Sequence, residues 1–254
     1  MARRSRFVMH FIATLALFGG APSAFAALAI NPAMDITQLV RVQPIIVAND
    51  NGTSPAESFG NSGQQSIIEG FIDDIWAQAG IDVDFLPSTN WNSTFANDGP
   101  GLFRTIDAAN AAGVNNSDPN VINMYFVNMI GGSAPGENSA SGVGVVGGNG
   151  VTQFVGTNLL SFTGGQEVIA SVVAHEIGHN LGLNHIVMAE NLMQAAGSTN
   201  DGERLNSSQI TTALNSGLST VLTNPPPPIP LPAAAWLFGS ALIGLVGVKR
   251  RRCA

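Results

Sequence analysis

The sequence predicts an α+β fold with a five-stranded mixed sheet, one long helix packed against it and a small C-terminal helical subdomain. Three observations support this prediction. Short runs rich in Val and Ile are bounded by Gly, Asn and Pro, as strands are. Only a few segments repeat apolar residues at helical spacing, and the longest of them follows Gly164 and Gly165. One more helical segment stands near the end of the domain, at 207–219.

The strands are expected from alternating or continuous apolar runs that end at turn residues. The first run ends in the loop Asn49-Asp50-Asn51-Gly52, and the last two flank Gly148-Asn149-Gly150, a turn sequence. The five predicted strands are 38–48, 81–86, 121–130, 142–147 and 151–157.

Helical spacing of apolar residues predicts a helix over 67–76 that Gly80 stops. The longest helix carries an apolar side made of Val168, Ile169, Val172, Val173 and Ile177. The last helix, at 207–219, should begin with a capping box between Asn206 and Gln209. Between the second and third strands, 88–119 is expected to be a long loop with one short helix near 102–112.

Residues 1–26 have the pattern of a secretory signal peptide. Three arginines precede an apolar run, and the small-residue site Ala24-Phe25-Ala26 follows it directly. A transmembrane anchor is the alternative, although the apolar run is short for one. The sequence therefore predicts export, with the main domain at 27–222.

The C-terminal end has three parts. Residues 223–232 form a Pro-rich linker, 233–248 an apolar transmembrane-like helix, and 249–254 a basic tail that would face the cytoplasm. This order resembles the PEP-CTERM sorting signal of Gram-negative bacteria, although Leu231 stands where that motif has glutamate. The resemblance implies an exosortase-like processing enzyme as a partner and a final place outside the cell or at its surface, with transient anchoring. A permanent C-terminal anchor is the alternative.

Charge and cysteine content exclude several classes of partner. Between the two end segments only Arg41, Arg104 and Arg204 oppose all 17 acidic residues, so the net charge there is −14. Such a surface argues against binding to nucleic acid or to anionic membranes, and it permits Ca²⁺ sites in the acidic loops. The single cysteine, Cys253, lies in the tail, so the domain has no internal disulfide.

The long helix carries the residues that point to chemistry. His175 and His179 are four residues apart, so both imidazoles project from one face of the helix, where they can bind one Zn²⁺ ion. Gly182 can end the helix in a left-handed turn, after which His185 can return as the third ligand. The fourth histidine of the chain, His10, lies in the signal peptide, so every histidine of the domain belongs to this pattern.

Three neutral nitrogen ligands leave a fourth position on zinc for a water of lowered pKa. Glu176 is rotated about 100° from His175 around the helix, outside the ligand set but within reach of that water. It is therefore the predicted general base, and it could then protonate the leaving amine. This set of residues predicts a zinc-dependent hydrolase.

The string from His175 to His185, with Gly182 between them, resembles the signature of the metzincin zinc metallopeptidases. Asn191-Leu192-Met193 resembles the Met-turn of that family, in which Met193 packs beneath the metal. The resemblance implies a zincin fold and peptide or protein substrates. It also implies a substrate-binding edge strand, for which Val143, Gly144 and Val145 are the candidates; a strand that only packs is the alternative. Ile186 matches none of the best-known metzincin groups, which leaves the subfamily open.

Two functions remain from different classes. The first is an exported zinc peptidase that uses Glu176. The second is a non-catalytic surface or exopolysaccharide-associated protein that keeps a zinc-bound metalloprotease-like fold, which the sorting tail and the Gly/Asn-rich loops would suit. The intact ligand set with its glutamate favours the enzyme. Cleavage specificity and oligomeric state have no signal in the sequence.

Overall fold

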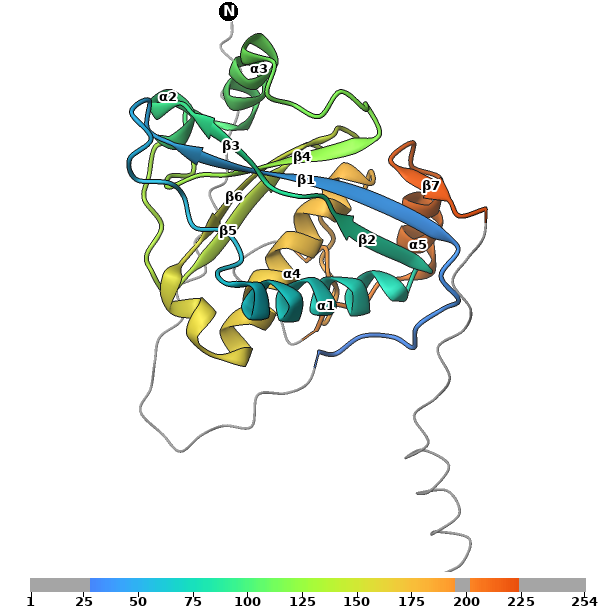
Figure 1. The fold of residues 1–254 in the computed structure, drawn as a ribbon. Helices are drawn as coiled ribbons and strands as arrows, with labels where there is room; N and C mark the ends of the chain where they lie inside the picture. Colours follow the sequence, from blue (N-terminus) through green and yellow to red (C-terminus); the bar gives the residue numbers. More distant parts are fainter. Residues whose placement is uncertain (1–27, 195–201, 224–254) are drawn as a thin grey trace, which may run out of the picture. The chain divides into compact units, whose positions relative to one another are not determined.

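A computed structural model describes residues 28–194 and 202–223 (Figure 1). The elements follow one another as β1 (Gln38–Ala48), α1 (Ser62–Ala77), β2 (Ile81–Phe85), β3 (Thr89–Asn92), α2 (Thr94–Asn97), α3 (Leu102–Ala112), β4 (Val121–Phe126), β5 (Ala140–Gly144), β6 (Gly150–Val155), a 3₁₀ turn (Thr157–Ser161), α4 (Thr163–Asn180), α5 (Ser207–Leu214) and β7 (Ser219–Val221). The fold is mixed α+β, as the sequence predicts. The capping box between Asn206 and Gln209 at the start of α5 is confirmed.

The sheet has seven strands, so the predicted number of five is wrong. Its main path runs β2-β1-β4-β6-β5, and β3 and β7 also pair with β1. Strand β1 is long enough to pair with β2 over its first half and with β3 over its second half, both in parallel. β4 and β6 continue the parallel set, and β5 closes it as an antiparallel edge strand.

The two missed strands have little apolar alternation. β3 has the sequence Thr-Asn-Trp-Asn, in which only Trp91 is buried, and β7 has three residues, none of them buried. Their pairing comes from the free backbone groups that the long strand β1 offers on its two sides. A pattern of side chains carries no signal for such pairing.

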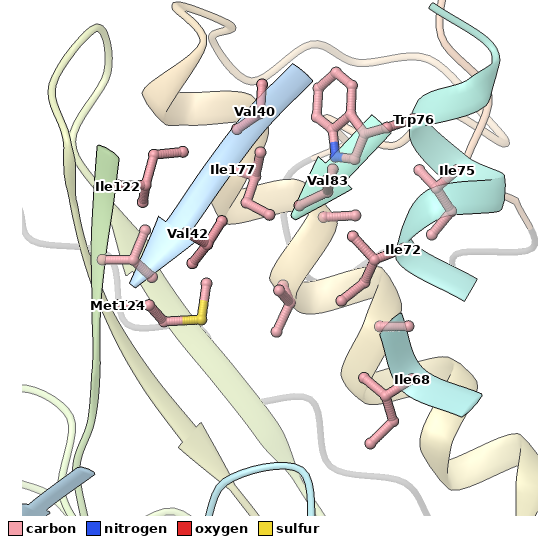
Figure 2. Packing of buried hydrophobic residues seen from close by; sticks show 14 of the residues in the cluster. Val40, Val42, Ile68, Ile72, Ile75, Trp76, Val83, Ile122, Met124 and Ile177 are labelled. Carbon is pink, nitrogen blue, oxygen red and sulfur yellow. The ribbon is translucent and has the colours of Figure 1, made fainter. Parts of the chain in front are cut away.

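Each face of the sheet is covered by helices. Figure 1 shows α1 and α4 on one face and α2 and α3 on the other. The larger core lies between the sheet and the pair α1 and α4, where Ile72, Trp76 and Ile177 are fully buried against Val42 and Met124 (Figure 2). A second core fills the opposite face. It contains Ile45, Val47, Trp91, Ala96, Ala109, Tyr125 and Val127.

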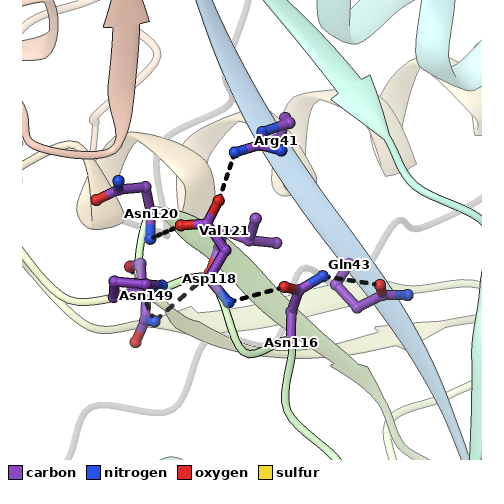
Figure 3. A network of polar contacts seen from close by, with 8 residues as sticks. Arg41, Gln43, Asn116, Asp118, Asn120, Val121 and Asn149 are labelled. Carbon is purple, nitrogen blue, oxygen red and sulfur yellow. Dashed lines mark hydrogen bonds and ion pairs between the residues drawn. The ribbon is translucent and has the colours of Figure 1, made fainter.

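A polar network fixes the loop that leads into β4 (Figure 3). Arg41 of β1 forms an ion pair of 2.6 Å with Asp118. The backbone N–H of Asn120 and then the Arg41 guanidinium hold the pKa of Asp118 below its ordinary value. Asn116 accepts a bond from the backbone of Asp118 and donates to Gln43 on β1. The loop is therefore tied to the central strand through Asn116 and Asp118.

Several predicted boundaries shift. β4 ends at Phe126 rather than at residue 130, and α5 ends at Leu214 rather than at 219. β5 begins at Ala140 and ends at Gly144, so Val145, which the prediction placed in the edge strand, lies outside the observed strand. The reason is the hairpin turn: Val145 N–H donates to Gly150, and its own carbonyl accepts from Gly148.

The expected signal peptide (1–26), Pro-rich linker (223–232), apolar helix (233–248) and basic tail (249–254) lie outside the described residues, apart from residue 223. Within 28–194 and 202–223, no helix is long and apolar enough to cross a membrane. This finding stands against the prediction of a transmembrane helix, which we withdraw.

Candidate metal centre

Helix α4 carries two of the three histidines. Its buried stripe of Ile169, Val173 and Ile177 faces the core, and the same packing fixes the side of the helix from which His175 and His179 project. Their rings lie edge to face, with centroids 4.8 Å apart. His179 is buried and His175 partly buried, so both rings are held by their surroundings.

Gly182 ends α4 and turns the chain back. Its φ is +94°, a conformation that favours glycine. Leu183 N–H donates to the carbonyl of Gly178 and Gly182 N–H to that of His179, which is the Schellman pattern of helix ends. His185 follows on the returning chain, where its ring centroid lies 4.7 Å from that of His179. The structure thus brings all three predicted ligands together.

Backbone carbonyls fix the orientation of two rings. Nδ1 of His175 lies 2.6 Å from the Leu192 carbonyl oxygen, and Nδ1 of His179 lies 2.8 Å from that of Leu183. A carbonyl oxygen can only accept, so both Nδ1 atoms carry the proton and both Nε2 atoms present a lone pair. Nε2 of His185 lies 3.1 Å from each of these two Nε2 atoms.

Burial favours the neutral form of the three imidazoles. It lowers the pKa of His175 to about 3, with further lowering by His179. Burial also lowers the pKa of His179 and that of His185. A neutral imidazole is the form that binds a metal ion, because a protonated Nε2 has no lone pair to offer.

This donor set fits a metal ion. One ligand atom from each histidine lies within 4.8 Å of the other two. A tetrahedral zinc ion with Zn–N bonds near 2.0–2.1 Å needs nitrogens about 3.3 Å apart, close to the two separations of 3.1 Å. Among the described residues, no other group of three His, Cys, Asp or Glu side chains converges in this way. The histidine triad is therefore able to hold a metal, and its nitrogen donors are consistent with zinc.

Glu176 lies beside this triad and is only 6% exposed. Burial raises its pKa to about 8, and the backbone N–H of Gly144, which donates to the carboxyl, opposes that rise. Oε2 has no hydrogen-bond partner among the described residues. A buried carboxyl with a free acceptor oxygen next to a metal-binding cluster is suited to accept a proton from a bound water.

The edge strand β5 runs past Glu176 and is tied to the end of α4. The Asn180 side chain donates to the carbonyls of Val145 and Gly150, at 3.0 and 3.1 Å. Gly147 N–H donates to the carbonyl of His179 at 2.9 Å. The hairpin between β5 and β6 and the metal-binding end of the helix therefore form one connected unit.

Met193 packs against the same helix. It is fully buried, and a Cβ on Gly178 would lie 2.6 Å from its Sδ atom. The turn that carries Met193 is joined to α5 by a buried amide pair, in which Asn191 and Gln209 each donate to the other at 2.9 Å. Asn191 also accepts from the Met193 backbone at 2.9 Å.

Sequence reasoning missed the partners that orient the site. The carbonyls of Leu183 and Leu192 and the N–H of Gly144 are backbone groups, which leave no signal in residue types. Asn180 and the pairing of Asn191 with Gln209 were also missed, since polar residues next to a motif are as common at the surface. Gly142 and Gly144, which lie on the same face of the edge strand, were the one feature of the sequence that could have indicated a close approach of another element.

The chain resembles a known metallopeptidase family over part of its length. Residues 80–186 match the family model described as metallo-peptidase family M12B, reprolysin-like. The matched segment runs from the start of β2 to just past the third histidine. The match supports a metal-dependent peptidase at the level of the family. No curated protein matches the chain significantly.

Several solved structures are also similar. The archaemetzincin of Archaeoglobus fulgidus, solved with malonate, is 13% identical over 68% of this chain and 99% of that chain, with a TM-score of 0.42. The archaemetzincin of Methanopyrus kandleri is 12% identical over 70% and 94%, with a TM-score of 0.45. Metalloproteinase-II of Bacteroides fragilis is 13% identical over 76% and 58%, with a TM-score of 0.47.

Proposed function

We propose that the protein is an exported zinc-dependent peptidase of the metzincin type, in which His175, His179 and His185 hold one catalytic zinc ion and Glu176 is the general base. The observation that carries the proposal is the tautomer of the two helical histidines. Nδ1 of each ring donates to a backbone carbonyl oxygen, so the lone pair of each ring lies on Nε2. Both of these Nε2 atoms lie 3.1 Å from Nε2 of His185.

A zinc ion held by these nitrogens would act as a Lewis acid. It would polarise a peptide carbonyl and lower the pKa of a bound water. The chain's own part of the reaction is proton transfer. Glu176 accepts a proton from the attacking water at a carboxylate oxygen and later gives it to the leaving amide nitrogen. Its pKa of about 8 belongs to the metal-free chain, and a nearby dication favours the ionised form that this role needs.

The edge of β5 supports a peptide as the substrate. In an antiparallel pair the hydrogen-bonded residues alternate, and the bonds at Ser139 and Val145 show that odd-numbered residues of β5 bond to β6. The N–H and carbonyl of Gly142 therefore point to the free edge, where an extended peptide can pair with them. Of the predicted edge residues, Val143 and Gly144 lie in β5, whereas Val145 lies in the turn.

Two further features support the metzincin type. Gly182 turns the chain so that the third histidine returns to the first two, as the spacing of the signature requires. Met193 packs under the helix against Gly178, between the two helical ligands. Neither residue offers a charge or a nitrogen donor, so we assign both a structural role.

The test is a mixed peptide library incubated with the full chain and read by mass spectrometry. Defined cleavage products that disappear with a chelator and return with zinc would support the proposal, and their ends would give the specificity. A chain that binds one zinc but releases no product would favour the non-catalytic surface protein. A chain that binds no zinc would contradict both.

Export and sorting are a separate part of the proposal. We infer removal of residues 1–26 from their signal-like pattern, and recognition of the C-terminal 223–254 by an exosortase-like enzyme. Sequencing both ends of the protein recovered from a Gram-negative host tests this. An N-terminus at Ala27 supports export; a protein that keeps residue 1 and stays in the cytoplasm contradicts it.

A further inference from the structure

Two glycines of the edge strand face Glu176. A Cβ atom on Gly142 would lie 2.5 Å from Cγ of Glu176 and 2.8 Å from Oε1 of Gln153. A Cβ on Gly144 would lie 2.7 Å from the carbonyl oxygen of Glu176 and 3.1 Å from Cβ of His179. Neither glycine has a positive φ, so the close approach of α4, and not the backbone conformation, is what requires glycine here.

The strand cannot move away to relieve such contacts. β5 pairs with β6 over its whole length. The following hairpin is held to the helix by Asn180 and by the bond from Gly147 to His179. An added methyl group must therefore displace either the Glu176 side chain or the helix itself.

The backbone of the same strand holds the carboxyl group. Odd-numbered residues of β5 bond to β6, so the N–H of Gly144 points to the free edge. There it donates to the Glu176 carboxyl. Gly142 leaves room for the Glu176 side chain, and the N–H of Gly144 donates to its carboxyl. Both residues of β5 therefore act on Glu176.

We propose that Gly142 and Gly144 are positioning residues for Glu176: they let the edge strand and α4 approach so closely that the carboxyl is held at the strand edge beside the metal-binding histidines. The kinetic consequence rests on the proposed peptidase function. The packing consequence does not, since it concerns only the contacts between β5 and α4.

The first variant is Gly142→Ala, whose nearest contacts are the middle of the Glu176 side chain and the amide oxygen of Gln153. We expect kcat to fall at least about tenfold, because a misplaced general base loses part of a contribution of about 10²–10⁴-fold. Zinc affinity and KM should stay within about twofold. Gly136→Ala is the matched control, because a Cβ there has no heavy atom within 4 Å.

The second variant is Gly144→Ala, which meets the helix backbone and Cβ of His179. Here zinc affinity should fall together with kcat, since a metal ligand moves as well as the base. The contrast between the two positions is specific to the proposal. General damage to the fold would change zinc affinity equally in both variants.

A thermal stability cycle tests the packing without any activity. Gly142→Ala should lower Tm by about 5 °C in the parent chain, and by much less in a Glu176→Ala background, where Cγ is absent and only the end of the flexible Gln153 side chain must move. Equal losses of Tm in both backgrounds would overturn the proposal, as would Gly142→Ala behaving like Gly136→Ala. If the parent chain has no peptidase activity, the proposed function fails while this cycle still decides the packing.

Discussion

His175 donates a hydrogen bond from Nδ1 to the carbonyl oxygen of Leu192 over 2.6 Å. Leu192 precedes Met193, whose side chain packs against Gly178 on the same helix. One buried turn therefore fixes the ring of a metal ligand through its backbone and supports the helix through its side chain. This double connection links the stability of the turn to the geometry of the metal site.

Loss of the exposed third ligand should remove metal binding without unfolding the chain. His185→Ala should weaken zinc binding by more than about 100-fold, since loss of an outer partner alone costs 10–100-fold. Tm of the metal-free protein should stay within about 2 °C, because His185 is exposed. Titration calorimetry and thermal melts with and without zinc measure both effects. Val187→Ala, a fully exposed neighbour, is the control; zinc-induced stabilisation that persists in His185→Ala would refute the assignment.

Truncation of Met193 should destabilise the fold while leaving the ligand set in place. The side chain is fully buried, and removal of a buried methionine to alanine costs about 2–5 kcal/mol. Met193→Leu keeps most of the volume and should cost less than about 1.5 kcal/mol. Chemical denaturation of the metal-free proteins measures these losses. Zinc stoichiometry should remain one in both variants, and loss of zinc from a folded Met193→Leu protein would contradict a role for Met193 in packing alone.

The buried amide pair between Asn191 and Gln209 should show coupling. Each side chain satisfies the other, so removal of either one leaves a buried polar group without its partner, at about 1–3 kcal/mol. The double variant should cost less than the sum of Asn191→Ala and Gln209→Ala. Denaturation of the four proteins gives the coupling energy, and strict additivity would contradict a direct interaction.

Asp73 on α1 should make stability depend on pH. Burial raises its pKa to about 7, the Val83 N–H lowers it, and nearby carboxylates, with Asp82 first, raise it. Below the ordinary value of 3.8 both folded and unfolded states are protonated. Between 3.8 and about 7 the unfolded chain ionises first, so stability falls as pH rises through this window and then levels off.

Asp73→Asn removes the free-energy cost of ionising this buried carboxyl. The asparagine oxygen can still accept the hydrogen bond from the Val83 N–H. We expect little change at pH 4 and a gain of about 1–2 kcal/mol at pH 8, reduced from the full shift because the group is only partly buried. Thermal melts at pH 4, 6 and 8 measure it. Asp84→Asn removes the same charge from an exposed site on β2; an equal gain there would mean that net charge, and not burial, is the cause.

Much of the fold and of the metal site could be predicted because they depend on side-chain patterns. The run of Val and Ile in β1 and the spacing of Ile169, Val173 and Ile177 in α4 reflect the faces that these elements bury. The spacing of His175 and His179 places both on one face of a helix. Gly182 marks the end of that helix, and His185 follows on the returning chain. These are properties of residue types at fixed intervals.

What could not be predicted depends on the backbone or on contacts distant in sequence. β3 and β7 form because β1 is longer than its neighbours, a fact of the assembled sheet. The carbonyl of Leu192 reaches a ring 17 positions earlier in the chain. The need for glycine at 142 depends on a helix that begins more than 20 residues later. None of these relationships exists before the chain is folded.

The measurement that tests the central claim most directly is the turnover of Glu176→Gln on a peptide that the parent chain cuts, with zinc content determined in the same samples. The change keeps the shape of the side chain and removes only its ability to take a proton. We predict one zinc per chain in both proteins and a loss of kcat of at least about 100-fold in the variant. A variant that holds its zinc and keeps full activity would contradict the account.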